Sequence, residues 1–363
     1  MGLPASSRLV FDLAGAAYDR GRAQAVLCAD RVGDVSAAVA RRLGELGPAL
    51  ALPSVVAWLD AQHAFVRDHD PDGYVEVQGI AEGFGIAADA LFACHFGDVI
   101  ADLAGGSALA DASTAWATAQ CEGGPVIVKN RDVRGGRNGL EGVFRHADPE
   151  WGGRRVLCVG SLGAPGAVAG GINSDGLAVA DTHVGTPDHG EGWLRPFLMS
   201  RLLRECANVA QAVALVFRLP HAGGGTLLLA DAAGAVAVVE LAHGAVAAEE
   251  PGERDYIART NHFMSDRLRG RDLATPDDIG ARASRARMAT LEHALRDLPV
   301  PFAHDALRKL MARHGDRASA GLCRHGAAGD VHTLGSAIFD CGGPALQISS
   351  GPPCESRWMR IPV

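Results

Sequence analysis

Apolar residues recur every three or four positions through the first third of the chain. The stretches 16–46, 53–69 and 87–104 all show this spacing, which predicts amphipathic helices. Pro53 suits the first turn of the second stretch, and the pair Gly105-Gly106 ends the third. We therefore expect residues 15–104 to be mostly helical.

The pattern changes after residue 110, where short runs rich in Val, Ile, Leu and Thr alternate with Gly-rich turns. These runs predict strands at 114–120, 125–132, 154–161, 176–184, 225–231, 235–242, 332–340, 345–350 and 357–362. One long helix is expected at 193–219, and two more at about 281–297 and 303–314. Strand pairs, helices and strand pairs again indicate an α+β layered fold, with antiparallel sheets covered by helices. The chain lacks the βαβ alternation of a Rossmann fold or a TIM barrel.

Composition narrows the function classes. Of 363 residues, 48% are hydrophobic, and 34 basic against 42 acidic side chains give a formal charge of −8. This balance argues against a nucleic-acid partner, and no apolar run approaches the ~18 residues of a membrane span. The first residues show no secretory signal, so we expect a cytoplasmic protein.

Familiar catalytic motifs are absent. The eight cysteines form no CxxC pair, the fourteen histidines show no metal-ligand spacing, and neither HExxH nor GxSxG occurs. The glycine-rich stretches 160–166 and 223–225 lack the spacing and the following helix of a phosphate loop. We therefore expect no metal and no tightly bound cofactor.

A predicted hairpin at 113–132 brings a hydroxyl and a carboxylate together. Glu122-Gly123-Gly124 supplies the turn. A turn centred on 122/123 pairs Ser113 with Asp132, and one centred on the two glycines pairs Asp132 with residue 115. Either register places Asp132 within about two residues of Ser113 across the ladder, which side chains can bridge. Asp132 could also merely cap a turn, so geometry alone does not establish a site.

Seven short segments of the chain form an ordered set of motifs. They are Gly79-Ile-Ala-Glu-Gly83, Asp111-Ala-Ser-Thr-Ala-Trp116, Asn130-Arg-Asp132, Gly171-Ile-Asn-Ser-Asp-Gly-Leu177, Thr260-Asn-His262, Gly321-Leu-Cys-Arg-His325 and Ser350-Gly-Pro-Pro-Cys354. Taken in order, these segments resemble the acyl-coenzyme A:6-aminopenicillanic acid acyltransferase family of autoproteolytic N-terminal-nucleophile (Ntn) acyltransferases and amidases. The resemblance runs in pieces from about residue 15 to 355.

The resemblance implies a fold and a domain division. The fold would be a four-layer αββα Ntn-hydrolase sandwich, with a helical leader at residues 1–112 packed on a core at 113–363, together one large domain. The self-cleavage junction would lie between Ala112 and Ser113. The two fragments would then stay associated.

The resemblance also implies roles for site residues. Ser113 would be the nucleophile, Asp132 would orient the new α-amine, and the Asn261 amide would donate to the oxyanion. Arg324 is a possible clamp for a substrate carboxylate, or a structural ion pair. Lys129 and His183 stand where the related bile-salt and penicillin V amidases have Arg and Asn, so their roles are open.

The implied chemistry needs no histidine base. The nucleophile attacks the carbonyl upstream of itself, an N→O acyl shift and hydrolysis follow, and the freed α-amine (pKa ~7.7–8.0) serves as base for its own hydroxyl. The resemblance implies an amide hydrolase or acyltransferase acting on a small acylated amine or natural-product-like substrate, with an acyl-coenzyme A or acyl-carrier thioester as a possible co-substrate. Pocket residues are expected from segments 84–100, 133–150 and 183–196.

The family usually has Cys where this chain has Ser113, and Gly where it has Ala112. Three explanations of the serine remain open: a native serine enzyme, a Cys→Ser form stalled in processing, and a family member without turnover that acts as a binding or scaffold protein.

Overall fold

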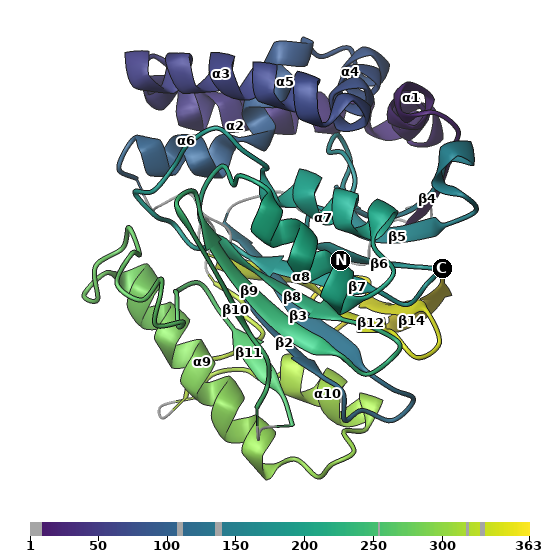
Figure 1. Cartoon of the computed structure of the whole chain (residues 1–363), viewed down its shortest axis with the longest axis vertical. Coiled ribbons are helices and arrows are strands. Elements are labelled where there is room, and N and C mark those ends of the chain that lie inside the picture. The colour runs from purple at the N-terminus through teal and green to yellow at the C-terminus, as the bar shows by residue number, and fades with distance from the viewer. Residues whose placement is uncertain (1–8, 107–111, 135–139, 253–254, 317–318, 327–330) are drawn as a thin grey trace.

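The computed structural model describes residues 9–106, 112–134, 140–252, 255–316, 319–326 and 331–363. Within them, the segment up to residue 103 forms a helical layer at one end of the molecule (Figure 1). Its α-helices are α1 (Ala17–Leu27), α2 (Val32–Leu50), α3 (Pro53–His69), α4 (Pro71–Phe84), α5 (Ala88–His95) and α6 (Gly97–Leu103).

Two stacked sheets form the core of the described chain. The eight-stranded sheet runs, in spatial order, β1 (Val10–Ala14), β4 (Glu141–Ala147), β5 (Arg155–Ser161), β6 (Gly170–Asn173), β7 (Ala178–Thr182), β8 (Gly225–Ala230), β9 (Val236–Ala242) and β10 (Ala245–Glu249). The six-stranded sheet runs β11 (Ile257–Arg259), β2 (Ala112–Thr118), β3 (Val126–Arg134), β12 (Val331–Asp340), β13 (Ala345–Ser349) and β14 (Trp358–Pro362). The described ladders are antiparallel except for the parallel pair β1–β4.

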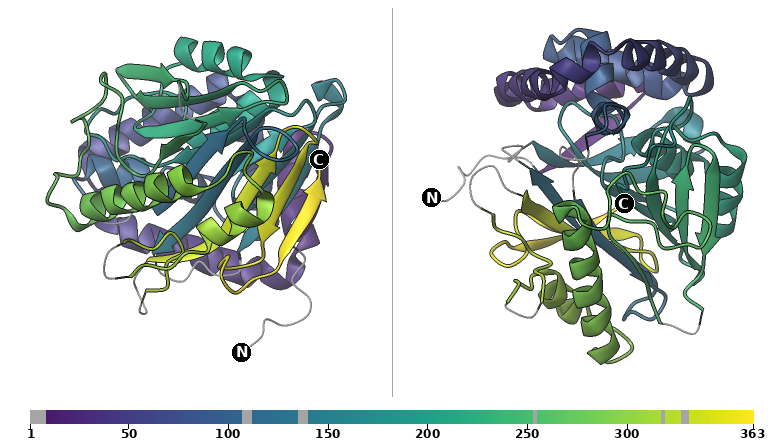
Figure 2. Two further views of the ribbon diagram at one scale, coloured as in Figure 1. Left: turned by 90° about the horizontal axis from the view of Figure 1, so that it is seen from below. Right: turned by 90° about the vertical axis from the view of Figure 1, so that its left-hand side faces the viewer.

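Helices cover both outer faces of the stacked sheets (Figure 2). They are α7 (Arg195–Glu205), α8 (Val209–Arg218), α9 (Ile279–Asp297) and α10 (His304–Met311). Strand β2 shows why the layers form, because its side chains alternate between two cores. Ala115 and Ala117 face the other sheet, whereas Trp116 packs with residues of α9 and α10. The predicted α+β, four-layer αββα architecture is confirmed, with the β2–β3 pair central in its sheet.

The helical layer contributes to the core sheet as well as covering it. Strand β1 pairs in parallel with β4, and α1 packs closely on α4. A Cβ added at Gly79 would lie 2.2 Å from the Tyr18 carbonyl oxygen, and one at Gly21 would lie 2.3 Å from that of Glu76. The motif Gly79–Gly83 is part of α4. Its glycines let two helices touch backbone to backbone.

Three predicted helices are broken. The stretch 16–46 divides into α1 and α2, 87–104 divides into α5 and α6 at Phe96, and 193–219 divides into α7 and α8. In the last case Cys206 is extended (ψ 142°), and the Asn208 side chain accepts a hydrogen bond from the Gln211 amide. The amphipathic pattern continues across this last break because α7 and α8 both pack on the eight-stranded sheet.

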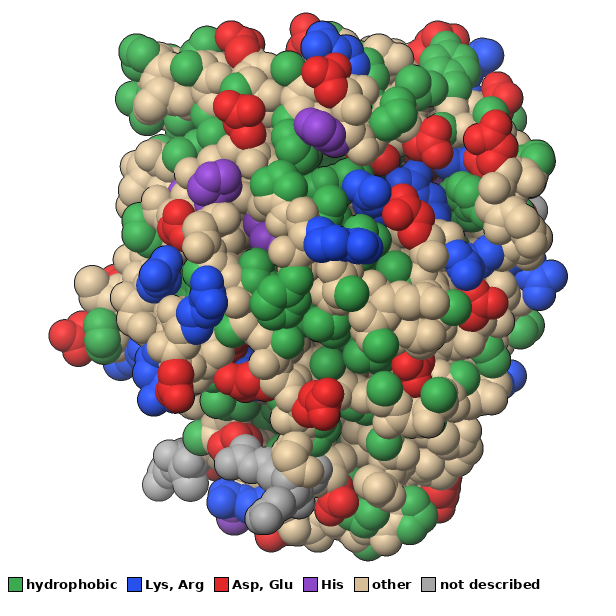
Figure 3. Space-filling view, viewed as in Figure 1, with side chains coloured by type: hydrophobic (Ala, Val, Ile, Leu, Met, Phe, Trp, Pro, Cys, Tyr) green, Lys and Arg blue, Asp and Glu red, His purple; other side chains and the backbone are tan. Residues whose placement is uncertain are grey.

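On the face shown in Figure 3, acidic and basic side chains are intermixed rather than gathered into one basic patch. Among the described residues no single helix is long and apolar enough to cross a membrane. The pair α4 and α5 has the required length and composition together, but the two are bent by 119°.

Candidate active site

Ser113 lies near the start of β2 with its side chain toward the space between the sheets. It is buried, and Arg131 of β3 lies directly opposite. It lines a cavity of about 180 Å³ roofed by the helical layer. Apolar lining comes from Val35, Val39, Leu91, Val99, Leu140, Leu162, Leu194 and Phe197. All three segments expected to line the pocket contribute to it, and the prediction missed the further contribution of residues 35–42 and 161–168.

The register of the predicted hairpin is wrong. Asp132 lies opposite Ala112, and Ser113 lies opposite Arg131, so neither predicted pairing occurs. The turn prediction assumed a tight hairpin, whereas Cys121 leaves it to form a parallel bridge with Phe302. Since side chains alternate along a strand, Ser113 and Asp132 point to opposite faces of the sheet. Asp132 is buried on the face that α9 and α10 cover, and its Oδ1 accepts a 2.6 Å hydrogen bond from Thr333.

Asn261 follows β11 and reaches the nitrogen of Ser113 rather than its hydroxyl. Its Oδ1 accepts a 3.0 Å hydrogen bond from the Ser113 N–H, and its Nδ2 donates to the His183 carbonyl at 2.9 Å. The structure thus brings Asn261 to Ser113, and the atom of Ser113 that Asn261 contacts is the backbone nitrogen.

Arg287 of α9 is a member of the site that the sequence did not reveal. It is buried, and its Nη2 donates to Asn261 Oδ1 at 2.6 Å while Nε donates to Thr114 at 3.2 Å. Burial lowers the pKa of Arg287 to about 10; the Asp132 carboxylate opposes this shift and Arg324 adds to it. Arg287 keeps the spacing of the buried positions of α9, which include Ser284, Met288 and Leu291. This spacing was the sequence signal that could have indicated a buried arginine.

A buried group of charged side chains lies beside Ser113, and we call it the charged floor: Lys129, Asp181 and Arg195. The Nζ of Lys129 donates to Asp181 at 2.6 Å and to the Ala169 carbonyl at 2.9 Å, and Arg195 donates to the other oxygen of Asp181 at 3.0 Å. Burial lowers the pKa of Lys129, and Asp181 opposes that shift. Burial alone would raise the pKa of Asp181, but the two cations outweigh it and lower the pKa to about 2.

His183 links this floor to a second carboxylate. Arg195 Nη2 lies 3.0 Å from His183 Nδ1, and because arginine only donates, the ring proton must sit on Nε2. That atom faces Asp102 at 3.7 Å, and His189 Nε2 lies 3.4 Å from the same oxygen. Burial would raise the pKa of Asp102, but the two histidines outweigh it and lower the pKa to about 2.

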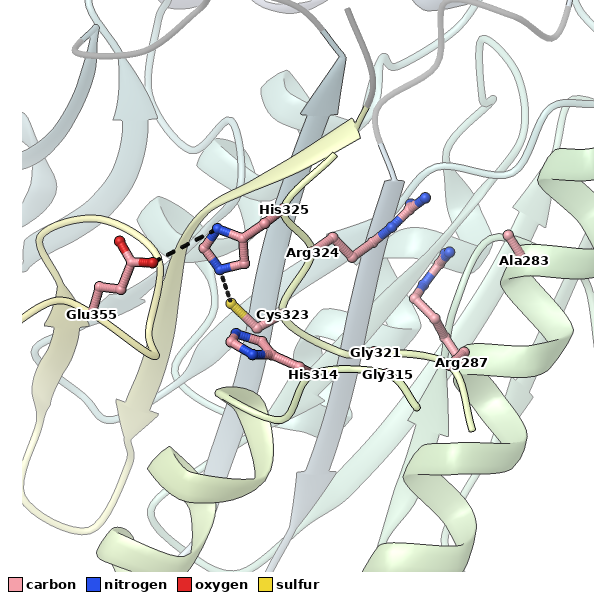
Figure 4. A pocket seen from close by; sticks show the side chains of 10 residues that line it. Ala283, Arg287, His314, Gly315, Gly321, Cys323, Arg324, His325 and Glu355 are labelled. Atoms are coloured by element: carbon pink, nitrogen blue, oxygen red, sulfur yellow. Dashed lines mark hydrogen bonds and ion pairs between the residues drawn. The ribbon is translucent and has the colours of Figure 1, made fainter. Parts of the chain in front are cut away.

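Arg324 lies outside the Ser113 cavity, in the loop before β12. It lines a second cavity of about 680 Å³ that shares Lys129 and Arg131 with the first. Figure 4 shows its guanidinium group close to that of Arg287. The two cavities thus meet at Lys129 and Arg131, next to the predicted nucleophile.

The comparisons with known proteins agree with the sequence motifs. The family profile described as acyl-coenzyme A:6-aminopenicillanic acid acyl-transferase matches residues 116–355. No curated protein matches the chain.

Several solved structures are similar at low sequence identity. A mutant of conjugated bile acid hydrolase from Clostridium perfringens is 12% identical, with 69% of this chain and 92% of that chain covered and a TM-score of 0.43. Penicillin V acylase from Agrobacterium tumefaciens is 12% identical, with 69% and 86% covered and a TM-score of 0.37. A second variant of the Clostridium hydrolase is 10% identical, with 69% and 97% covered and a TM-score of 0.40.

The family match spans well over half of the chain, and it includes β3, the Asn261 segment and the loop of Arg324. The chain therefore belongs to the acyl-coenzyme A:6-aminopenicillanic acid acyl-transferase family, a family of Ntn-type enzymes that act on acyl and amide C–N bonds.

Proposed function

We propose that Ser113 is the nucleophile of an autoproteolytic amide hydrolase or acyltransferase that acts on a small acylated amine. One observation carries the proposal: the Ser113 side chain lines a partly apolar cavity while its backbone nitrogen is held by Asn261. An Ntn enzyme uses both atoms of this residue, the hydroxyl as nucleophile and the nitrogen as base.

The maturation step is an acyl shift followed by hydrolysis. Ser113 Oγ attacks the carbonyl carbon of Ala112 and its proton passes to the departing nitrogen, so the Ala112–Ser113 amide becomes an ester. Water then hydrolyses the ester, leaving a carboxylate on Ala112 and a free α-amine on Ser113. The products would be chains of 112 and 251 residues, which we propose stay associated.

Asn261 would keep the Ser113 nitrogen in position throughout. After cleavage, Oδ1 would accept from the α-amine, which leaves the nitrogen lone pair free to take the hydroxyl proton. The Asn261 Nδ2 group carries two hydrogens, and one is bonded to His183. We assign the second to the oxyanion of the substrate.

Asp132 would act on the amine only after the cut. It lies directly opposite Ala112, so departure of Ala112 opens the position that faces the carboxylate. The Ser113 nitrogen, which becomes the new amine, is bonded to the carbonyl carbon of Ala112 before the cut and so lies next to that position. This arrangement supports the role of Asp132 in orienting the amine although its side chain and that of Ser113 lie on opposite faces.

The two cavities suggest where the acyl part and the leaving part of a substrate would bind. The smaller one offers apolar walls for an acyl group above the charged floor. The larger one, which Arg324 lines, would hold the amine part or the thiol part of an acyl-coenzyme A or acyl-carrier thioester. Lys129 and Arg131 border both.

Denaturing gels with mass spectrometry of fresh protein test the proposal. We expect the wild type to give fragments cut before residue 113. Cleavage should be faster in Ser113→Cys, because a thiol (pKa ~8.5) ionises more readily than a hydroxyl. Ser113→Ala should not be cleaved. Turnover of a panel of N-acyl amines and acyl thioesters should require residue 113 to be Ser or Cys. Cleavage elsewhere, or cutting of Ser113→Ala, would show that the nucleophile is misassigned. A Ser113→Cys protein that neither cleaves nor turns over any substrate would favour the binding or scaffold role.

A further inference from the structure

Four metal-ligating side chains from three segments converge at the carboxyl-terminal side of the molecule. His314 follows α10, Cys323 and His325 lie in the loop before β12, and Cys354 lies between β13 and β14. Their nearest ligand atoms all lie within 4.8 Å of one another. Figure 4 shows His314, Cys323 and His325 directed toward a common point.

The spacing of three of these atoms, those of Cys323, His325 and Cys354, is close to that of a tetrahedral zinc site. Zinc binds sulfur at ~2.3 Å and nitrogen at ~2.0–2.1 Å, so the edges of the tetrahedron are ~3.8 Å for S–S and ~3.5 Å for S–N. Here Cys323 Sγ and Cys354 Sγ are 3.6 Å apart. His325 Nε2 lies 3.4 Å from the first sulfur and 3.0 Å from the second.

A neighbouring carboxylate completes the arrangement. His325 presents Nε2 to the sulfurs, and its Nδ1 faces Glu355 Oε1 at 4.0 Å. Metal-bound histidines usually direct their second nitrogen to such an acceptor, which fixes the tautomer and the ring orientation. Thiolate and imidazole ligands select zinc over magnesium or calcium, and four protein ligands leave no open position for catalysis.

We propose that His314, Cys323, His325 and Cys354 bind one structural zinc ion. Binding displaces a proton from each thiol, so two protons are released and the complex of Zn²⁺ with two thiolates is neutral. The absence of CxxC spacing concealed this site in the sequence, because its ligands alternate between Cys and His over forty residues.

The ion would fix the loop that carries Arg324. Arg324 stands between two of the ligands, and its backbone N–H donates to Thr333 Oγ1 at 2.8 Å. The same hydroxyl donates to Asp132 at 2.6 Å. Zinc would therefore hold Arg324 and Thr333 in place on the face of the sheet where Asp132 lies.

Metal analysis of the full chain tests the site independently of cleavage or turnover. We expect about one zinc per chain after dialysis against metal-free buffer, or after reduction and reconstitution with Zn²⁺, with two protons released per ion. After removal of zinc by a chelator, Co²⁺ should give the visible bands of a tetrahedral ion and a thiolate charge-transfer band.

Matched variants locate the ligands. Cys354→Ser and His314→Gln should lower the affinity for zinc at least tenfold, whereas Cys94→Ser and His293→Gln, in α5 and α9, should leave it unchanged. If a ligand variant fails to fold, the cobalt spectrum of the wild-type chain still reports thiolate ligation. A wild-type chain that binds no zinc after reduction, a Cys323–Cys354 disulfide that persists in place of the metal, or full zinc content in both ligand variants would overturn the proposal.

Discussion

The backbone N–H of Ser113 donates a 3.0 Å hydrogen bond to Oδ1 of Asn261, a residue 148 positions further along the chain. Strand β11 produces this contact, because it pairs with β2 and delivers the next residues to the start of that strand. Arg287 donates to the same oxygen at 2.6 Å. One amide oxygen therefore connects the predicted nucleophile to α9.

Replacing Asn261 by Ala should slow self-cleavage with modest loss of fold stability. The change removes the oxygen that accepts from Arg287 Nη2 and from the Ser113 N–H. A lost buried hydrogen bond costs ~1–3 kcal/mol, or a factor of about 5–150 in rate. Fragment appearance on gels measures it. Asn208→Ala is the control, since removing that helix cap should lower the free energy of unfolding by ~1 kcal/mol without slowing cleavage. Equal rates in Asn261→Ala and wild type would contradict the role of Asn261.

Replacing Asp132 by Asn should leave a folded protein with slower processing or turnover. The substitution removes a charge but little volume, and Arg287 loses the nearby carboxylate that opposes the lowering of its pKa. We expect circular dichroism close to wild type and a clear fall in the rate of fragment appearance or of amide turnover. Asp305→Asn is the matched control, because it makes the same chemical change at an exposed position of α10 and should leave cleavage and turnover unaltered. Unaltered cleavage and turnover in Asp132→Asn would remove Asp132 from the mechanism.

Acid should destabilise the fold from pH 6.5 downward, partly through His146. Burial first, and then Arg20 and Arg204, lower the pKa of this histidine to about 3. Between pH 6.5 and 3 this histidine binds a proton in the unfolded chain but not in the folded chain. The free energy of unfolding therefore decreases as the pH is lowered, by up to ~1.4 kcal/mol per pH unit for this group. Urea unfolding of His146→Gln at several pH values should show a shallower fall, whereas exposed His293→Gln should follow wild type. If the free energies of unfolding of wild type, His146→Gln and His293→Gln fell equally with decreasing pH, His146 would have no part in the acid destabilisation.

Glycine-to-alanine changes in two helices should have opposite effects. In Gly79→Ala the new methyl group meets the Tyr18 carbonyl at 2.2 Å, so α1 and α4 must separate. We expect a loss of ~1–3 kcal/mol in the free energy of unfolding. In Gly44→Ala nothing lies within 4 Å, and we expect a gain of ~0.5–1 kcal/mol from helix propensity. Thermal unfolding compares them, and stabilisation by Gly79→Ala would refute the close packing.

Local patterns predicted the helices and many of the strands, and missed features that depend on distant partners. Strand β1 was missed because its parallel partner β4 lies about 130 residues later. The pairing of Asp132 was wrong by one residue because the bridge of Cys121 to Phe302 forms outside the hairpin. Arg287 was missed although its spacing matches the buried positions of α9, and its contact with Asn261 is visible only in the folded chain. The approach of Asn261 to Ser113 followed from the family motifs, and no local spacing indicated it.

The parallel pairing of β1 with β4 gives the proposed maturation an unusual outcome. Residues 10–14 would belong to one product of the cut while the strand beside them belongs to the other, so an internal ladder becomes a quaternary interface. The smaller product also supplies Val35, Leu91 and Val99 to the cavity of Ser113. The mature protein would be a heterodimer in which one subunit carries the nucleophile and its partner supplies part of the wall that selects the acyl group. Selectivity could then be altered by changing a subunit that takes no part in bond breaking.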